Sequence, residues 1–212
     1  PIEATVTDAN GNPVTGVSVT WTPIGGGAVS PSVAVTGAAG RVSTVRTLGP
    51  TAGPQSTTAT AILSGGSTVI TFTATATVGG ASQLALVSGD AQADTVGATL
   101  GTPLSVIARD ALNNPVAGVL ITWSIVDGGG SVSPATSTTN ASGVATTQWT
   151  LGTVTTPADS TQSARASGPG SPVNFVATSR PGAVNAAQSL VAVAPASIAA
   201  SRTSPATVTV TA

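Results

Sequence analysis

The chain has 212 residues, of which only 6% are charged, whereas soluble domains carry about 25% charged residues. Its six arginines and seven acidic residues give a formal net charge of −1, so it lacks the dense basic surface that binds nucleic acid. Cysteine, histidine and lysine are absent, which excludes disulfides, thiolate metal sites and the Ser-His-Asp, Cys-His and Ser-Lys arrangements of nucleophilic enzymes. We therefore predict a protein that is not an enzyme and that has no cofactor.

The pattern of apolar residues argues against both a transmembrane helix and a disordered chain. The most apolar stretch, Leu190–Ala200, is shorter than the roughly 20 residues that span a bilayer, and it contains Pro195. Aromatic residues make up only 2% and small polar residues are abundant, as in disordered chains. However, Val, Ile and Thr alternate with polar residues in one segment after another, which is typical of half-buried β-strands.

The sequence repeats itself with a period of about 102 residues. Residues 8–21 read DANGNPVTGVSVTW and residues 110–123 read DALNNPVAGVLITW, which gives nine identities at an offset of 102. The match continues at an offset of 103, where GGGAVSP and TLG are followed later by GGGSVSP and TLG. After a predicted two-residue insertion before Ala166, Phe72 is matched by Phe175, again at an offset of 103. Insertions of this kind belong in turns between shared strands.

The repeat divides the chain into three parts. Residues 1–78 are predicted to be an immunoglobulin-like repeat that lacks its first strand, residues 82–180 a complete repeat, and residues 187–212 the first strands of a third. Short linkers are predicted at Val78–Ser82 and Thr178–Ala187. Three prolines, spaced by 102 residues and each ahead of an alternating strand, mark the copies: Pro1, Pro103 and Pro205.

Alternation within each copy predicts which side chains form the core. Trp21 and Trp123 are expected at its centre. A copy of about 100 residues with about seven short strands is typical of a two-sheet sandwich, so the predicted fold class is all-β, with tandem immunoglobulin-like β-sandwiches. The inward residues of the second copy are Leu104, Val106, Ala108, Val119, Ile121, Trp123, Val173, Phe175 and Ala177. The outward residues are Ser105, Arg109, Thr122 and Asn174.

The order of these elements resembles the group 1 bacterial Ig-like domains of intimin and invasin type. DANGNPV, GVSVTW, a Gly-rich turn, a Gly-led strand, TLG and a downstream Phe strand carry the resemblance, which spans the whole chain. It implies an immunoglobulin-like fold, an extracellular location and a tandem array that serves as a rod. It implies no ligand site, because adhesion in that family usually belongs to terminal domains of another type.

One turn has the residues of a calcium loop. Asp8, Asn10 and Asn12 place side-chain oxygens at alternate positions. In the second copy, however, Leu112 replaces Asn10 and no glutamate closes the loop. We therefore expect Asp8 and Asp110 to accept backbone N–H bonds in an Asx-type turn, and we assign no catalytic, cofactor-binding or metal-binding residue.

Carboxylates, one tryptophan and possible glycan sites offer further candidates. Asp90 and Asp94 could pair as in a glycosidase, but we expect solvating charges. Trp149 stands where the first copy has Arg46, either as a contact residue or as a packing residue of the second copy alone.

Asn140 begins one N-glycosylation sequon. The low charge also suggests O-glycans on exposed threonines such as Thr71, Thr73, Thr75 and Thr77.

Three functions fit these features. The first is a stalk or spacer in which tandem sandwiches hold a distal part of a bacterial surface protein away from the cell. The second is a self-assembling filament or surface-layer subunit, in which Gln188–Ala212 fills the incomplete first repeat of another copy by strand complementation, head to tail. The third is a carbohydrate- or receptor-binding adhesin module, which needs aromatic or charged loops that are scarce here. The expected partners are neighbouring repeats and other copies of the chain, and the expected location is the cell surface.

Overall fold

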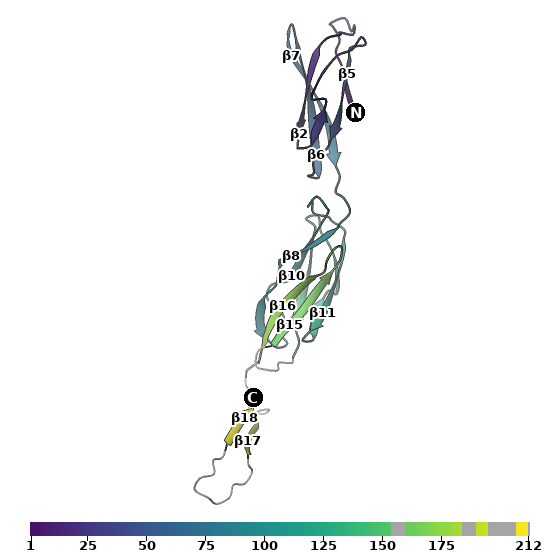
Figure 1. The fold of residues 1–212 in the computed structure, drawn as a ribbon. Coiled ribbons are helices and arrows are strands. Elements are labelled where there is room, and N and C mark those ends of the chain that lie inside the picture. Colours follow the sequence, from purple (N-terminus) through teal and green to yellow (C-terminus); the bar gives the residue numbers. More distant parts are fainter. Residues whose placement is uncertain (154–159, 184–189, 195–206, 212) are drawn as a thin grey trace, which may run out of the picture.

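The computed structural model describes residues 1–153, 160–183, 190–194 and 207–211, and every regular element among them is a β-strand. None of the described residues belongs to a helix that is long and apolar enough to span a membrane. We call residues 1–78 unit 1 and residues 82–180 unit 2. Figure 1 shows the two units end to end along one direction, followed by a β-hairpin. The predicted all-β fold is thus confirmed.

Unit 1 consists of two antiparallel sheets, with strand orders β1-β5-β3 and β4-β2-β6-β7. Alternating Val and Thr in these segments produce the alternating burial of the strands, because successive side chains point to opposite faces. The strands are β1 (Ile2–Thr5), β2 (Ser18–Ile24), β3 (Ala28–Ser30), β4 (Val33–Val35), β5 (Arg41–Thr47), β6 (Gly53–Leu63) and β7 (Gly66–Ala76).

Unit 2 has the same two sheets, each extended by one strand, with orders β12-β14-β10-β8 and β13-β11-β15-β16-β9. Its added strands β8 and β9 have no counterpart in unit 1, where β1 and β7 are the outer strands of their sheets among the described residues. Strand β9 pairs with β16 in parallel, whereas the other pairs are antiparallel. The strands are β8 (Gln83–Ser88), β9 (Gln92–Thr95), β10 (Leu104–Arg109), β11 (Leu120–Asp127), β12 (Gly130–Ser133), β13 (Thr136–Thr138), β14 (Val144–Leu151), β15 (Ser160–Ser167) and β16 (Val173–Arg180).

The last two strands pair with each other as β8 and β10 of unit 2 do. Strand β17 (Leu190–Ala194) is antiparallel to β18 (Thr207–Thr211), with Val191 opposite Val210. In unit 2, Leu84 of β8 lies opposite Ala108 of β10, and Val210 stands 102 positions after Ala108. The pairing therefore favours a third copy, which stays a prediction because residues 187–189, 195–206 and 212 lie outside the described part.

The core between the sheets is centred on the two predicted tryptophans. Trp21 and Trp123 are each only 2% exposed, so the prediction that they are equivalent core residues is confirmed. Each packs against a phenylalanine, with ring centroids 5.8 Å apart for Phe72 in unit 1 and 6.0 Å apart for Phe175 in unit 2. Of the predicted inward residues of unit 2, all are buried except Val119 and Val173, which are half-buried.

Three expectations from the sequence are wrong in detail. Ser105 is buried rather than exposed, because β10 lies between β14 and β8, which shield a small side chain. The linker predicted at Thr178–Ala187 cannot begin at Thr178, since β16 continues to Arg180 and residues 184–187 lie outside the described part. Ala166 pairs with Trp123 as Ala59 pairs with Trp21, an offset of 107, so the insertion has four residues rather than two.

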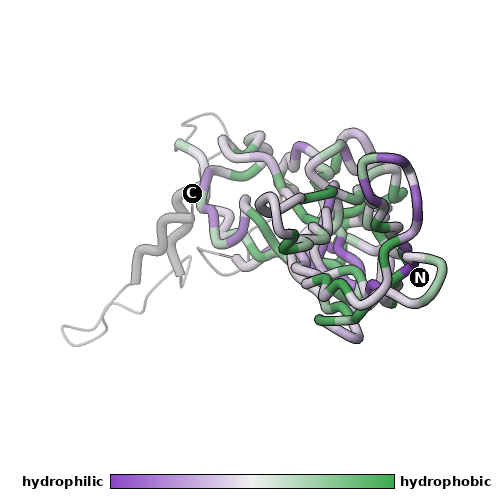
Figure 2. The backbone as a smooth tube through the Cα atoms, turned by 90° about the horizontal axis from the view of Figure 1, so that it is seen from above, coloured by the Kyte–Doolittle hydropathy of each residue, from purple (hydrophilic) through white to green (hydrophobic). Residues whose placement is uncertain are grey.

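Charge contributes little to the stability of this fold. Figure 2 shows hydrophobic and hydrophilic residues interspersed along the backbone. Among the described residues, one ion pair is formed, between Arg41 and Glu3 at 2.9 Å, and both side chains are exposed. Such a surface pair contributes about 0–1 kcal/mol. The sandwiches are therefore held by their cores and by backbone pairing.

Candidate functional site at the junction of the two units

An aspartate turn of unit 2 is built around one carboxylate. Asp110 Oδ1 accepts the backbone N–H groups of Leu112 at 2.9 Å and Asn114 at 2.8 Å. The side-chain amide of Asn114 also donates to Asp110 Oδ2 at 3.0 Å. Asn113, between them, adopts a left-handed conformation with φ of 70°. These bonds fix the orientation of the Asn114 amide relative to the carboxylate.

The same two side chains bind unit 1. Asn114 Oδ1 accepts the backbone N–H of Ala52 at 3.0 Å, and Asn114 Nδ2 donates to the carbonyl of Pro50 at 2.9 Å. Asp110 Oδ2 accepts the backbone N–H of Gly79, in the linker, at 3.0 Å. Three hydrogen bonds thus join the turn of unit 2 to a loop and the linker of unit 1. We call this contact, formed by Asp110, Asn114, Pro50, Ala52 and Gly79, the inter-unit clasp.

The loop of unit 1 is held in place from within by a buried glutamine. Gln55, at 4% exposure, accepts the backbone N–H of Gly49 at 2.8 Å and donates to the carbonyl of Thr51 at 2.9 Å. Gln162 has the same role in unit 2, where it accepts the backbone N–H of Gly152 at 2.8 Å. Because this loop is already fixed, presenting the carbonyl of Pro50 and the N–H of Ala52 to Asn114 costs little conformational entropy.

The bonds of the clasp depend on the charge of the Asp110 carboxylate, because this group is buried among N–H donors. Asp110 is 2% exposed and Asn114 is 8% exposed. The side-chain amide of Asn114, and then the backbone N–H of Gly79, lower the pKa of Asp110 from 3.8 to about 2. Each of these donors favours the ionised carboxylate, because only that form accepts all of these bonds. At neutral pH the clasp therefore contains a buried carboxylate that is satisfied by N–H donors.

The equivalent turn of unit 1 has the same internal hydrogen bonds, but its Asp8 and Asn12 side chains are exposed to solvent. Asp8 Oδ1 accepts the N–H groups of Asn10 at 2.9 Å and Asn12 at 2.8 Å, while Asn12 Nδ2 donates to Asp8 Oδ2 at 2.9 Å. The Asn12 side-chain amide is the main cause that lowers the pKa of Asp8. The hydrogen bonds expected of an Asx-type turn are thus present in both units. The described residues contain no cluster of three acidic or other metal-ligating side chains, and the metal assignment stays untested.

The other sequence candidates have structural contacts. Asp90 Oδ1 accepts the backbone N–H of Val176 at 2.8 Å and so fixes the corner between β8 and β9 to β16, whereas Asp94 caps its neighbour Thr95. Trp149 is fully buried in the core of unit 2, so it is a packing residue and not a surface contact. At the matching place in unit 1, Arg46 donates to the carbonyl of Gly26 at 2.7 Å.

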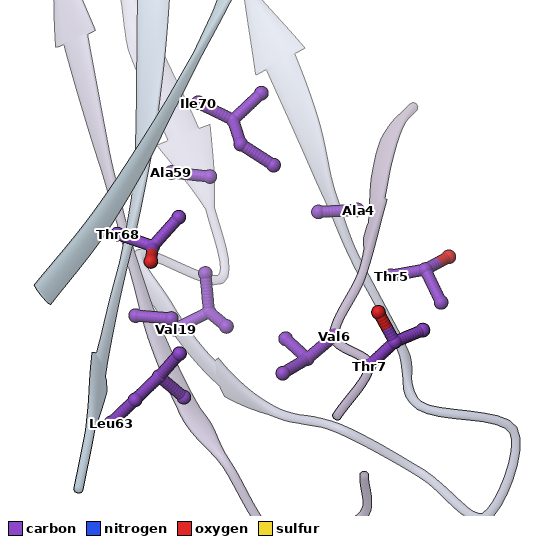
Figure 3. A pocket seen from close by; sticks show the side chains of 10 residues that line it. Ala4, Thr5, Val6, Thr7, Val19, Ala59, Leu63, Thr68 and Ile70 are labelled. Atoms are coloured by element: carbon purple, nitrogen blue, oxygen red, sulfur yellow. The ribbon is translucent and has the colours of Figure 1, made fainter. Parts of the chain in front are cut away.

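Unit 1 also has an open slot between its outer strands β1 and β7 (Figure 3). The slot is a pocket of about 180 Å³ that is mainly apolar. In unit 2, Leu84 of β8 packs against the core beside Ile121 and lies opposite Ala108. The counterparts of Ile121 and Ala108 line the slot, so it corresponds to the place of β8. The slot is lined by Ala4, Thr5, Val6, Thr7, Val19, Ala59, Ala61, Leu63, Thr68 and Ile70.

The clasp residues were not predicted as a site. The turn motif singles out Asp8, Asn12 and Asp110, but nothing in the sequence indicates a partner for Asn114 or a role for Gln55. The only available signal was that both the turn and the TLG loop are repeated at nearly the same offset. That signal does not tell which two repeated segments come together at the junction.

Comparison with solved structures finds domains of bacterial surface proteins. The D0-D1 domain of intimin is 19% identical, with 84% of this chain and 87% of that chain covered, at a TM-score of 0.35. Invasin, a bacterial integrin-binding protein, is 21% identical over 97% of this chain and 41% of its own, at a TM-score of 0.41. Domains 4-9 of the surface layer protein SbsC are 15% identical over 89% of this chain and 26% of theirs, at a TM-score of 0.39.

No protein-family model matches the chain, and no curated protein matches it. At these identities the likeness to solved structures concerns the fold alone. Intimin and invasin are the proteins that the resemblance in the sequence named, and the all-β architecture of units 1 and 2 agrees with it.

Proposed function

We propose that this chain is a non-enzymatic stalk or spacer segment of a bacterial surface protein, located outside the cell. The inter-unit clasp carries the proposal, because a spacer must hold its repeats at a fixed separation. A short linker alone leaves neighbouring domains free to move. Three hydrogen bonds to a buried carboxylate and a buried amide oppose that movement, since opening the joint would break them.

The distribution of aromatic side chains supports the stalk over a binding module. Invasin binds integrin, and carbohydrate or receptor sites usually display aromatic groups. In this chain Trp21, Trp123, Trp149 and Phe175 are at most 2% exposed, and Phe72 is half-buried. These five residues are all the aromatic residues of the chain. Many of the exposed residues in the described part of the chain are Thr, Ser, Ala and Gly, and the threonines and serines provide sites for the proposed O-glycans.

The stalk proposal is tested by measuring how freely the joint moves. The chain lacks cysteine, so Thr22→Cys and Thr122→Cys, both on exposed positions of β2 and β11, allow a spin label on each unit. We expect a narrow distance distribution that broadens with Asn114→Ala, because this substitution removes two clasp bonds. Leu112→Ala, in the same turn and exposed, is the matched control. Equal widths in Asn114→Ala and Leu112→Ala would contradict a joint that is fixed by the clasp.

A second candidate function, a head-to-tail filament, is favoured by the open slot in unit 1. A strand with an apolar residue in the position of Leu84 would complete the sheet and fill the pocket. In this proposal residues 187–212 of another copy supply that strand. Unpaired sheet edges are established sites of such additions.

Truncation tests the filament proposal. Deleting residues 187–212 should abolish polymerisation measured by sedimentation and electron microscopy. A synthetic peptide of residues 82–88 should compete for the slot, and the same peptide with Leu84→Ser should compete less. Filaments that persist after the deletion, or an intact chain that stays a monomer, would exclude strand donation.

A further inference from the structure

The turn of unit 1 is already in the conformation that binds a neighbouring unit. Asp8 and Asn12 make the same internal hydrogen bonds as Asp110 and Asn114, although no described residue of another unit packs on them. Both unit 1 residues are exposed, whereas both unit 2 residues are buried by unit 1. The conformation is therefore a property of the turn sequence and does not depend on the partner.

Three bonding positions at the turn of unit 1 correspond to those that unit 2 uses in the clasp. In unit 2 the amide oxygen and an amide N–H of Asn114 bond to Ala52 and Pro50. The carboxylate oxygen Oδ2 of Asp110 bonds to the N–H of Gly79. The matching atoms belong to Asn12 and Asp8, and no unit packs on them.

We propose that the Asp8–Asn12 turn is a docking surface for the C-terminal end of another repeat of this type. This inference rests on the proposed stalk function, because it extends the same clasp to a second joint. The partner is defined by its chemistry: a loop that offers a carbonyl and, two residues later, an N–H group, together with a linker whose backbone N–H reaches the carboxylate.

The contacts in unit 2 set narrow requirements for this partner. Pro50 supplies a carbonyl but has no N–H group, so the loop presents one acceptor and one donor to a single amide. At Gly79, a methyl group would lie 3.4 Å from Asp110 Oδ2, so the linker passes close to the carboxylate. An acidic residue in the linker would be repelled by that charge. The partner is therefore a neutral end of a repeat whose linker brings a backbone N–H close to the carboxylate.

The preformed turn keeps the ordering cost of docking low. The bonds between Asp8 and Asn12 fix the amide before contact, and Gln55 fixes the opposing loop in the same way. Rigid surfaces of this kind lose little conformational entropy when they associate.

An extended chain tests the inference. Residues 1–102 are placed directly before Pro1 of the full chain, which keeps the native spacing, since Asp8 and Asp110 are 102 positions apart. Spin labels on Thr22 of the added copy and on Thr22 of the original chain report on the new joint. We expect the distance distribution at the new joint to be as narrow as that at the native joint. Asn12→Ala in the original chain should broaden it, whereas the exposed control Asn10→Ala should not.

A second measurement is independent of any effect of Asn12→Ala on folding. In the extended chain the side-chain carboxyl of Asp8, followed by NMR, should titrate at a lower pH than in the parent chain, because it gains the N–H of Gly79 from the added copy. An unchanged titration of Asp8, or an added joint that is insensitive to Asn12→Ala, would overturn the inference. If Asn114→Ala also fails to broaden the native joint, the stalk proposal fails as well. If Asn114→Ala does broaden it, only the docking surface at Asp8–Asn12 is wrong.

Discussion

The indole N–H of Trp123 donates a hydrogen bond to the hydroxyl of Ser137 at 2.8 Å. Trp21 has the same position in unit 1, but its indole nitrogen is buried without a partner among the described residues. The reason is a single substitution between the repeats. Ala34 lies opposite Val19, as Ser137 lies opposite Ile121, so unit 1 has a methyl group where unit 2 has a hydroxyl.

Ala34→Ser should therefore stabilise unit 1. An added hydroxyl at this place gives Trp21 a hydrogen-bond acceptor, and a bond of this kind contributes about 0.5–1.5 kcal/mol. Ala38→Ser, in an exposed turn, is the control and should change the free energy of unfolding little. Urea unfolding followed by tryptophan fluorescence measures both. A destabilised Ala34→Ser variant would show that the packing around Trp21 has no room for the oxygen.

Trp123→Ala should destabilise unit 2 by about 3–5 kcal/mol, as expected for a large-to-small change in a core. The reason is that Trp123 is 2% exposed and packs against Phe175. Chemical denaturation measures the loss, and Leu112→Ala, at an exposed site, should cost no more than about 0.5 kcal/mol. Trp149→Ala alone should leave blue-shifted emission from the other two tryptophans. Red-shifted emission from a Trp149→Ala variant that circular dichroism shows to be folded would place Trp21 and Trp123 in water.

The clasp should weaken in acid. The pKa of Asp110 is lowered from 3.8 to about 2, first by the amide of Asn114 within the turn and then by the N–H of Gly79 across the joint. The part that comes from Gly79 stabilises the joint while the carboxylate is ionised. This stabilisation is lost as the pH falls toward 2, when the carboxylate takes up a proton and can no longer accept all its bonds. The distance distribution between labels on Thr22 and Thr122 should broaden over this range. Asp110→Asn should lack this acid transition, whereas the exposed control Asp94→Asn should keep it.

Calcium should not raise the melting temperature. Both oxygens of Asp110 already accept N–H bonds, and Asp8 is bonded in the same way to Asn10 and Asn12. A cation would have to displace these donors. Thermal unfolding in millimolar calcium and in a chelator should therefore give the same midpoint. A rise of many degrees with calcium would contradict this, because binding to the native state stabilises it by mass action.

Much of the fold could be predicted from the sequence because its causes are local. Alternation placed Leu104, Val106 and Ala108 in the core, and all three are buried. Ser105 could not be placed in this way, because its burial depends on the neighbouring strands β14 and β8. Ser105 also lies at a β-bulge where the register between β10 and β8 shifts, and alternation does not predict such a local irregularity.

The clasp could not be predicted for a related reason. Its turn is visible in the sequence, since Asp110 bonds to residues only two and four positions away. The bond from Asn114 to Pro50, however, joins residues 64 positions apart in different units. Asn12 shows that the same turn forms without any partner. The local pattern therefore carries no information about whether a second unit is docked.

The parallel pairing of β9 with β16 determines how unit 2 responds to a pulling force. The chain enters unit 2 through β8 and β9 and leaves through β16, and Gln92 lies opposite Ala177 while Thr95 lies opposite Arg180. Because the two strands run in the same direction, tension on the two ends of the unit slides them past each other. The backbone bonds between them are then loaded together instead of opening one after another. We therefore expect unit 2 to resist stretching along the direction in which the repeats follow one another.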